Sequence, residues 1–104
     1  MITVHCVDIS GSMSDEQIAK AQREVLKRFK PRDIVALFDV RYIIVRDLER
    51  NFKELYRLKV IGRPSSLATD VLKFAQEQNA KTILYSDGYL VEDQLSQFDE
   101  FVEV

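Results

Sequence analysis

The feature that most constrains the fold of this chain is an apolar run at residues 2–7 that leads directly into a polar turn and then a helix. Nearly every residue of the run is apolar, which is typical of a strand covered on both faces at the centre of a parallel sheet. The turn at residues 8–12 reads Asp-Ile-Ser-Gly-Ser. In open α/β sheets ligands bind beyond the carboxyl ends of the strands, so this turn lies where a binding site is expected.

Three oxygen-bearing side chains alternate in this turn. Asp8, Ser10 and Ser12 would point the same way from an extended backbone, with Gly11 giving conformational freedom between the serines. Carboxylate and hydroxyl oxygens suit Mg²⁺, Mn²⁺ or Ca²⁺ better than zinc, which prefers His and Cys. The alternative is a simple helix start, in which Ser14 caps the helix and Asp8 accepts hydrogen bonds from the backbone.

Composition and charge limit the classes of function. The 104 residues predict one domain, residues 1–104, and 46% hydrophobic with 31% charged residues is typical of a soluble globular protein. A net charge of -2 and a pI near 5.4 give no reason to expect nonspecific binding to nucleic acid or to a membrane.

The single cysteine and the single histidine both lie in the apolar run. We expect Cys6 to be a buried, unreactive thiol, which fits a reducing compartment, and His5 to be a packed or hydrogen-bonded structural residue. No basic and apolar leader precedes the run, and no segment approaches the roughly 20 apolar residues that cross a bilayer. We therefore expect a cytoplasmic protein.

The first half of the chain predicts a β-α-β-β order. An amphipathic helix is expected at residues 14–29, with a capping box at Ser14 and Gln17 and an end near Pro31. Apolar runs at residues 34–38 and 42–45 predict two strands. Only three residues separate them, which permits an antiparallel hairpin and excludes a helical crossover. Residues 47–58 predict a short surface helix or irregular cover.

The second half predicts two further helices and two further strands. A polar turn at residues 62–66 precedes an amphipathic helix that ends about residue 79. A strand then runs from residue 82 into Asp87-Gly88. A short helix near residues 92–98 and a last strand near 101–104 complete an α/β pattern.

The turn motifs together resemble those of von Willebrand factor A (VWA) domains, which hold a metal-ion-dependent adhesion site (MIDAS). Asp8, Ser10 and Ser12 match the D-x-S-x-S signature, and Ser86-Asp87-Gly88 matches the T-D-G motif with Ser in place of Thr. Ser66 matches the Thr of the family's Gly-Gly-Thr turn. Ser65 and Thr69 are alternatives for that position.

The resemblance implies a fold and a metal site. The fold would be Rossmann-like, with three layers and a mostly parallel sheet of strand order 3-2-1-4-5 in which strand 3 is antiparallel. Ser10 and Ser12 would bind the ion directly, Ser66 directly or through water, and Asp8 and Asp87 mainly through waters. Such a largely neutral shell, with Mg²⁺ as the expected ion, invites an Asp or Glu from a partner protein. Met13, Arg63 and Tyr89 are expected around that contact.

Two other functions fit parts of the sequence. Phosphatases of the haloacid dehalogenase type also place an Asp after their first strand, but they use Asp-x-Asp, in which the second acid protonates the leaving group. Ser10 occupies that second position here, so a binding role is favoured over an enzyme. A degenerate VWA scaffold that binds no metal is the other alternative.

Overall fold

Strands and helices alternate along the chain. The structure is a computed structural model, and it describes residues 1–39, 48–60, 68–88 and 92–104. The elements are β1 (Thr3–Asp8), α1 (Asp15–Arg28), β2 (Ile34–Phe38), α2 (Leu48–Tyr56), β3 (Lys59–Val60), α3 (Ala68–Glu77), β4 (Lys81–Ser86), α4 (Glu92–Leu95) and β5 (Glu100–Glu103). Within these described ranges, no helix is both long and apolar enough to cross a membrane.

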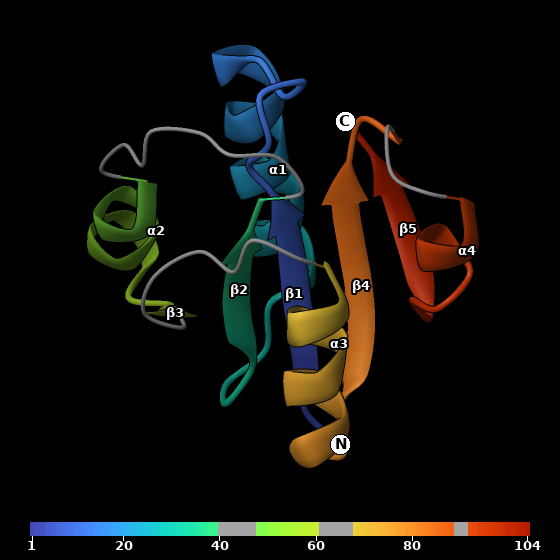
Figure 1. Cartoon of the computed structure of the whole chain (residues 1–104). Coiled ribbons are helices and arrows are strands. Elements are labelled where there is room, and N and C mark those ends of the chain that lie inside the picture. Colours follow the sequence, from blue (N-terminus) through green and yellow to red (C-terminus); the bar gives the residue numbers. More distant parts are fainter. Residues whose placement is uncertain (40–47, 61–67, 89–91) are drawn as a thin grey trace.

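The strands form one sheet in the order β3-β2-β1-β4-β5, with β1 at its centre (Figure 1). All four pairings are parallel. His5 of β1 lies opposite Val35 of β2 and Ile83 of β4, which confirms the prediction that the first strand lies between the second and the fourth. Because every strand runs the same way, all their carboxyl ends meet at one edge of the sheet.

The prediction of an antiparallel third strand was wrong. The strand beside β2 is β3, which pairs in parallel with Ile34 opposite Lys59. The chain reaches β3 through α2, and a helical crossover returns the chain to the start of the sheet, so the next strand runs parallel. The expected strand at residues 42–45 lies outside the described residues.

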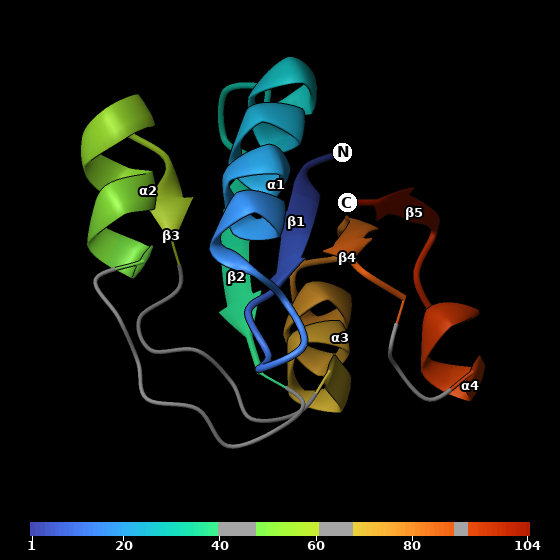
Figure 2. The same ribbon diagram turned by 90° about the horizontal axis from the view of Figure 1, so that it is seen from above.

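Helices cover both faces of the sheet. Figure 2 shows α1 and α2 on one side and α3 and α4 on the other. Side chains of the strands alternate between the two sides: Val7 and Leu37 pack in the core beneath α1, whereas Cys6 and Ala36 pack in the core beneath α3. These three layers around a parallel sheet make a Rossmann-like α/β fold.

Helix α1 follows its sequence signals closely. Ile18, Ala21 and Val25 are buried on one face. At the start of the helix, the backbone N–H of Gln17 donates to Ser14 Oγ and the Ser14 N–H donates to Gln17 Oε1, at 3.1 and 2.8 Å. The helix ends at Arg28, shortly before Pro31. The predicted capping box and the predicted end are confirmed.

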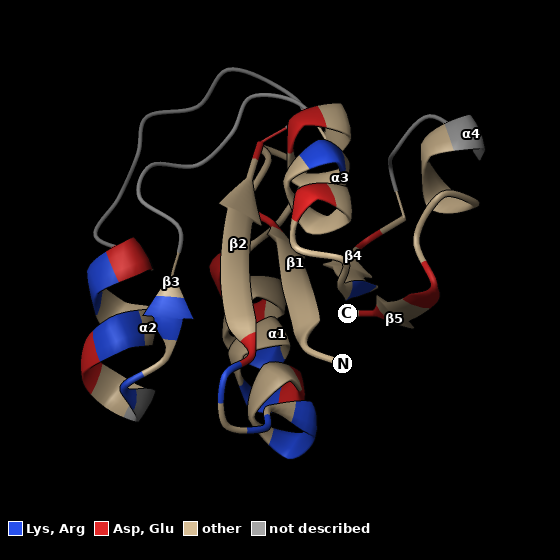
Figure 3. Ribbon diagram, turned by 90° about the horizontal axis from the view of Figure 1, so that it is seen from below, with Lys and Arg blue, Asp and Glu red and all other residues tan. Residues whose placement is uncertain are grey.

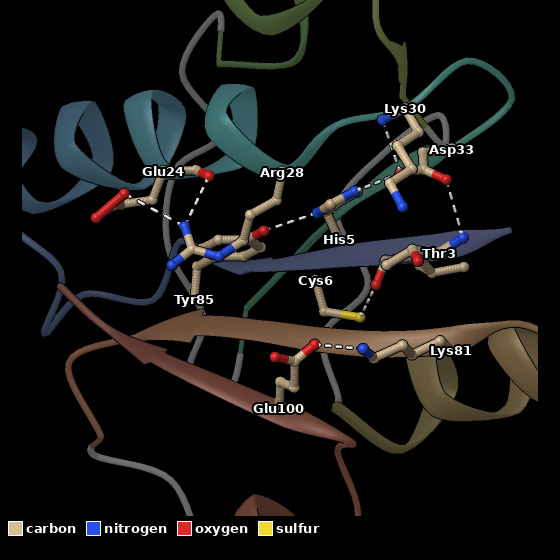
Figure 4. A network of polar contacts seen from close by, with 11 residues as sticks. Thr3, His5, Cys6, Glu24, Arg28, Lys30, Asp33, Lys81, Tyr85 and Glu100 are labelled. Atoms are coloured by element: carbon tan, nitrogen blue, oxygen red, sulfur yellow. Dashed lines mark hydrogen bonds and ion pairs between the residues drawn. The ribbon is translucent and has the colours of Figure 1, made fainter.

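A buried polar network fixes the amino-terminal half of β1 (Figure 4). His5 is fully buried, with Nδ1 2.7 Å from the Tyr85 hydroxyl and Nε2 2.9 Å from Asp33 Oδ2. The Asp33 carboxylate also accepts hydrogen bonds from the backbone N–H groups of Thr3 and Lys30. A carboxylate only accepts, so His5 donates from Nε2 and its Nδ1 accepts the Tyr85 proton. The prediction of a structural histidine is confirmed.

Burial favours the neutral forms of His5 and of the neighbouring Cys6 thiol. Burial lowers the pKa of His5 below its usual value, and the Arg28 charge adds to this effect, although Asp33 opposes it. Burial raises the pKa of the Cys6 thiol far above its usual range, so the thiol is unreactive, as expected. Hydrogen bonds from His5, Lys30 and Thr3 lower the pKa of Asp33 even though burial alone raises it.

The buried His5 predicts that the protein loses stability on acidification at pH values above those at which ordinary carboxylates titrate. The unfolded chain takes up a proton on His5 near its usual pKa of 6.5, whereas the folded chain resists that proton. The free energy of unfolding, measured with urea, should therefore fall by on the order of 1 kcal/mol between about pH 7 and pH 5.

The matched control is His5→Gln, because glutamine can still donate to Asp33 but does not titrate. This variant should lose the pH dependence in that window, whatever its absolute stability. His5 is the only histidine of the chain. If the stability of the variant depends on pH as steeply as that of the wild-type protein, the effect comes from groups other than His5.

Candidate functional site

The Asp8 carboxylate lies at the carboxyl end of the central strand and is fully buried. Its Oδ1 accepts the backbone N–H of Ser10 at 2.8 Å, and its Oδ2 accepts the Ser86 hydroxyl at 2.7 Å. Ser86 is the last residue of β4, which lies beside β1 in the sheet. Two motifs that are 78 residues apart in the sequence are therefore joined by one hydrogen bond.

The two serines of the first motif lie together beside Asp8. Ser10 is buried and Ser12 is half-buried, with their hydroxyl oxygens 3.1 Å apart. The backbone N–H of Met13 donates to the Ser10 carbonyl at 2.9 Å, which closes the turn before α1 begins. The structure thus brings Asp8, Ser10 and Ser12 together at the end of β1, as their spacing predicted.

Asp87 lies at the same edge of the sheet, directly after the end of β4. It is half-buried and follows Ser86, whose hydroxyl oxygen lies 3.4 Å from Asp87 Oδ1 and accepts the Gly88 N–H at 3.1 Å. Gly88 has a φ of +87°, a left-handed conformation that favours glycine. Ser86 therefore contacts both carboxylates, a role that the sequence alone did not assign to it.

Burial raises the pKa of Asp8 above its usual value. The hydrogen bonds from Ser10 and Ser86 lower the pKa, the Asp87 charge raises it further, and the net shift is upward. The charged form of Asp8 is thus held in a place that penalises negative charge. A bound cation would relieve that penalty.

The donor set at this edge fits a hard divalent cation, because it consists of carboxylate and hydroxyl oxygens. Within the described residues, no group of three or more His, Cys, Asp or Glu side chains could hold a metal ion. An ion at this edge would therefore depend on the hydroxyls of Ser10 and Ser12. Ser66 and its alternative Ser65 lie outside the described residues, and Thr69 is exposed in the first turn of α3.

A third carboxylate at this edge, that of Asp39, was not predicted as a site residue. Asp39 follows β2 directly and is 7% exposed. The ladder between β1 and β2 continues beside it, where the Ile9 N–H donates to the Phe38 carbonyl at 2.8 Å. Residues 39–41 were expected to form a short connection that permits a hairpin. The signal was an acid directly after a buried strand, the same signal that pointed to Asp8.

One of the three residues expected to surround a partner contact is in the core. Met13 is 6% exposed and packs with the residues beneath α1, so it cannot shape a contact at the surface, and that prediction was wrong. An apolar side chain at the start of a helix gains more from burial than from solvent exposure. Arg63 and Tyr89 lie outside the described residues.

The pKa shift of Asp8 predicts a stability cost in the absence of cations. At neutral pH, Asp8→Asn removes a buried charge and leaves one acceptor and one donor for Ser10 and Ser86. In EDTA the variant should unfold at a higher urea concentration, with a gain of roughly 1 kcal/mol. Glu103→Gln removes an exposed charge from β5 and should leave stability nearly unchanged. A loss of stability in Asp8→Asn would show that the charge itself supports the fold.

The resemblance to VWA domains depends on the motif residues and on their positions at the ends of β1 and β4. No protein-family model, curated protein or solved structure matches the chain. The function of this edge of the sheet is therefore inferred from its own chemistry.

Proposed function

We propose that this chain is a VWA-type protein-interaction module that binds a divalent cation, Mg²⁺ in the first place, at the carboxyl edge of its sheet. The observation that carries the proposal is the buried Asp8 carboxylate, which lies at the end of the central strand close to the hydroxyls of Ser10 and Ser12. A buried acid with a raised pKa beside neutral oxygen donors is a natural partner for a cation.

In this proposal Ser10 and Ser12 bind the ion, and Asp8 and Asp87 act mainly through waters and by orienting the hydroxyls. Ser66 supplies the remaining hydroxyl. The ion supplies an electrophilic position that accepts an acidic group of another protein. We also assign the module to the cytoplasm, because its one cysteine, Cys6, is a buried free thiol that suits a reducing compartment.

The chemistry favours binding over catalysis. The only histidine of the chain, His5, is occupied by Asp33 and Tyr85 inside the protein. Ser10 occupies the position at which a phosphatase of the haloacid dehalogenase type needs its second acid, and a serine hydroxyl cannot serve as that acid. The module in this proposal has no catalytic residue.

One observation favours a second candidate, a scaffold that binds no metal. The polar groups at this edge already bond to one another: Ser10 Oγ lies 3.1 Å from Ser12 Oγ, and Ser86 donates to Asp8. Such a cluster is a stable way to end two strands even without an ion.

A magnesium titration followed by amide chemical shifts separates these two candidates. The metal-binding module predicts saturable shifts at millimolar Mg²⁺ in residues 8–14 and 86–88. Ser12→Ala should weaken the binding by about tenfold or more, because it removes an oxygen donor. Thr3→Ala, which removes a hydroxyl at the other end of β1, is the matched control. If Mg²⁺, Mn²⁺ and Ca²⁺ all leave these amides unmoved, the chain is the scaffold.

A second experiment tests the recognition of acidic groups. With Mg²⁺ at saturation, acetate should shift the same amides further, because its carboxylate completes the shell of the ion. Acetamide has the same shape without the charge and should have no effect, and EDTA should abolish the response to acetate. Equal responses to acetate with and without Mg²⁺ would show that carboxylates bind elsewhere on the protein.

A further inference from the structure

Four basic side chains gather at the end of the sheet opposite Asp8. Lys30 and Arg32 lie in the turn between α1 and β2, and Arg57 and Lys59 lie where α2 leads into β3; all four are exposed. The pairing of Ile34 with Lys59 brings the two segments side by side. We call these four residues the basic ridge. Figure 3 views the molecule from this end, with the basic residues in blue.

The side chains of the basic ridge have no ion-pair partner among the described residues. Several other basic side chains have a glutamate partner within 3.3 Å: Lys27 and Arg28 with Glu24, Arg50 with Glu54, Lys53 with Glu49, and Lys81 with Glu100. In the parts of the chain that the structure describes, none of the four ridge side chains forms an ion pair. The ridge thus differs from the paired charges along α1 and α2.

The two arginines of the ridge occupy equivalent positions. Arg32 and Arg57 each come two residues before a member of the Ile34–Lys59 pair, and both have a left-handed backbone, with φ of 81° and 54°. Like charges at matching positions of neighbouring segments repel each other. Phosphate groups bound to the two arginines would remove the repulsion, because a guanidinium can hold two phosphate oxygens at once.

The charges around the ridge favour a linear ligand over a flat one. On the β4–β5 side of this same end, the chain carries the exposed acids Glu77 and Asp99, together with Glu100, which is paired with Lys81. A membrane surface would meet these acids together with the ridge and be repelled by them. A polyanionic strand can follow the ridge across β2 and β3 and avoid them.

From these observations we propose that the basic ridge binds the phosphate backbone of a nucleic acid, without reading its base sequence. Lys and Arg contacts to phosphates position a protein on nucleic acid but carry no sequence information. The net charge of -2 does not oppose this binding, because charges more than about 8 Å away are screened at physiological ionic strength. The surface is at the opposite end of the strands from the candidate cation site and is independent of it.

The test is fluorescence anisotropy of a short fluorescein-labelled DNA duplex in EDTA, so that the cation site plays no part. We expect binding at about 50 mM salt that weakens steeply toward about 200 mM, with a log–log slope of about -3 to -4 for four phosphate contacts. Absence of binding at the low salt concentration would overturn the proposal.

Arg32→Gly with Arg57→Gly is the decisive variant, because glycine suits both left-handed positions and should preserve the fold. It should reduce the salt slope by about 2 and weaken binding by at least about tenfold at low salt. Lys20→Gln with Lys73→Gln removes the same charge from exposed positions of α1 and α3 and should have a much smaller effect. Equal losses in the two double variants would show that overall charge alone explains the binding.

Sedimentation with vesicles of phosphatidylserine and phosphatidylcholine tests whether the ridge binds membranes instead. The proposal predicts that the wild-type protein sediments with them weakly and that the double glycine variant sediments equally weakly. If the vesicles bind the wild-type protein strongly but do not bind the double glycine variant, the ridge binds membranes and the proposal is wrong.

Discussion

The structure depends on the burial of β1 from Val4 to Asp8, because each polar side chain there must find its partner inside the protein. β4 supplies a partner toward each face of the sheet. The Tyr85 hydroxyl meets His5 beneath α1, and the Ser86 hydroxyl meets Asp8 on the opposite face. These two contacts fix the register of the central pair of strands as well as its position. The candidate site is therefore positioned by the same pair of buried strands that forms the centre of the core.

The two buried polar residues of β1 have opposite effects on stability. His5 is neutral and hydrogen-bonded on both ring nitrogens, so it stabilises the fold at neutral pH. Asp8 has a raised pKa, so its charge at neutral pH opposes folding. A residue that opposes folding at a position where asparagine would fit is typical of a functional site. This contrast supports the proposal that the carboxyl end of β1 has a role beyond packing.

The sequence predicted the elements with strong periodicity and failed where the signal was short. Helix α1 and the strands beside it followed from apolar runs and caps, whereas the contact of β1 with β4 followed from the fold that the resemblance implies. β3 has only two residues, and two residues carry no periodicity, so the pairing with β2 alone makes them a strand. Within the site, alternation placed Asp8, Ser10 and Ser12 together. Asp39 was missed because it lies in the short segment that was expected to connect two strands of a hairpin.

The central place of β1 also has a consequence for the synthesis of the protein. β1 is made before the other strands of the sheet, yet the Tyr85 hydroxyl that bonds to His5 is 80 residues further along the chain. At about 5–20 residues per second, the ribosome needs roughly 4–16 s to supply it. During that interval an apolar strand has no neighbour on the β4 side and exposes backbone groups that can pair with other chains. The growing chain is thus most vulnerable to aggregation before β4 emerges, and a chaperone that covers residues 2–7 would protect it.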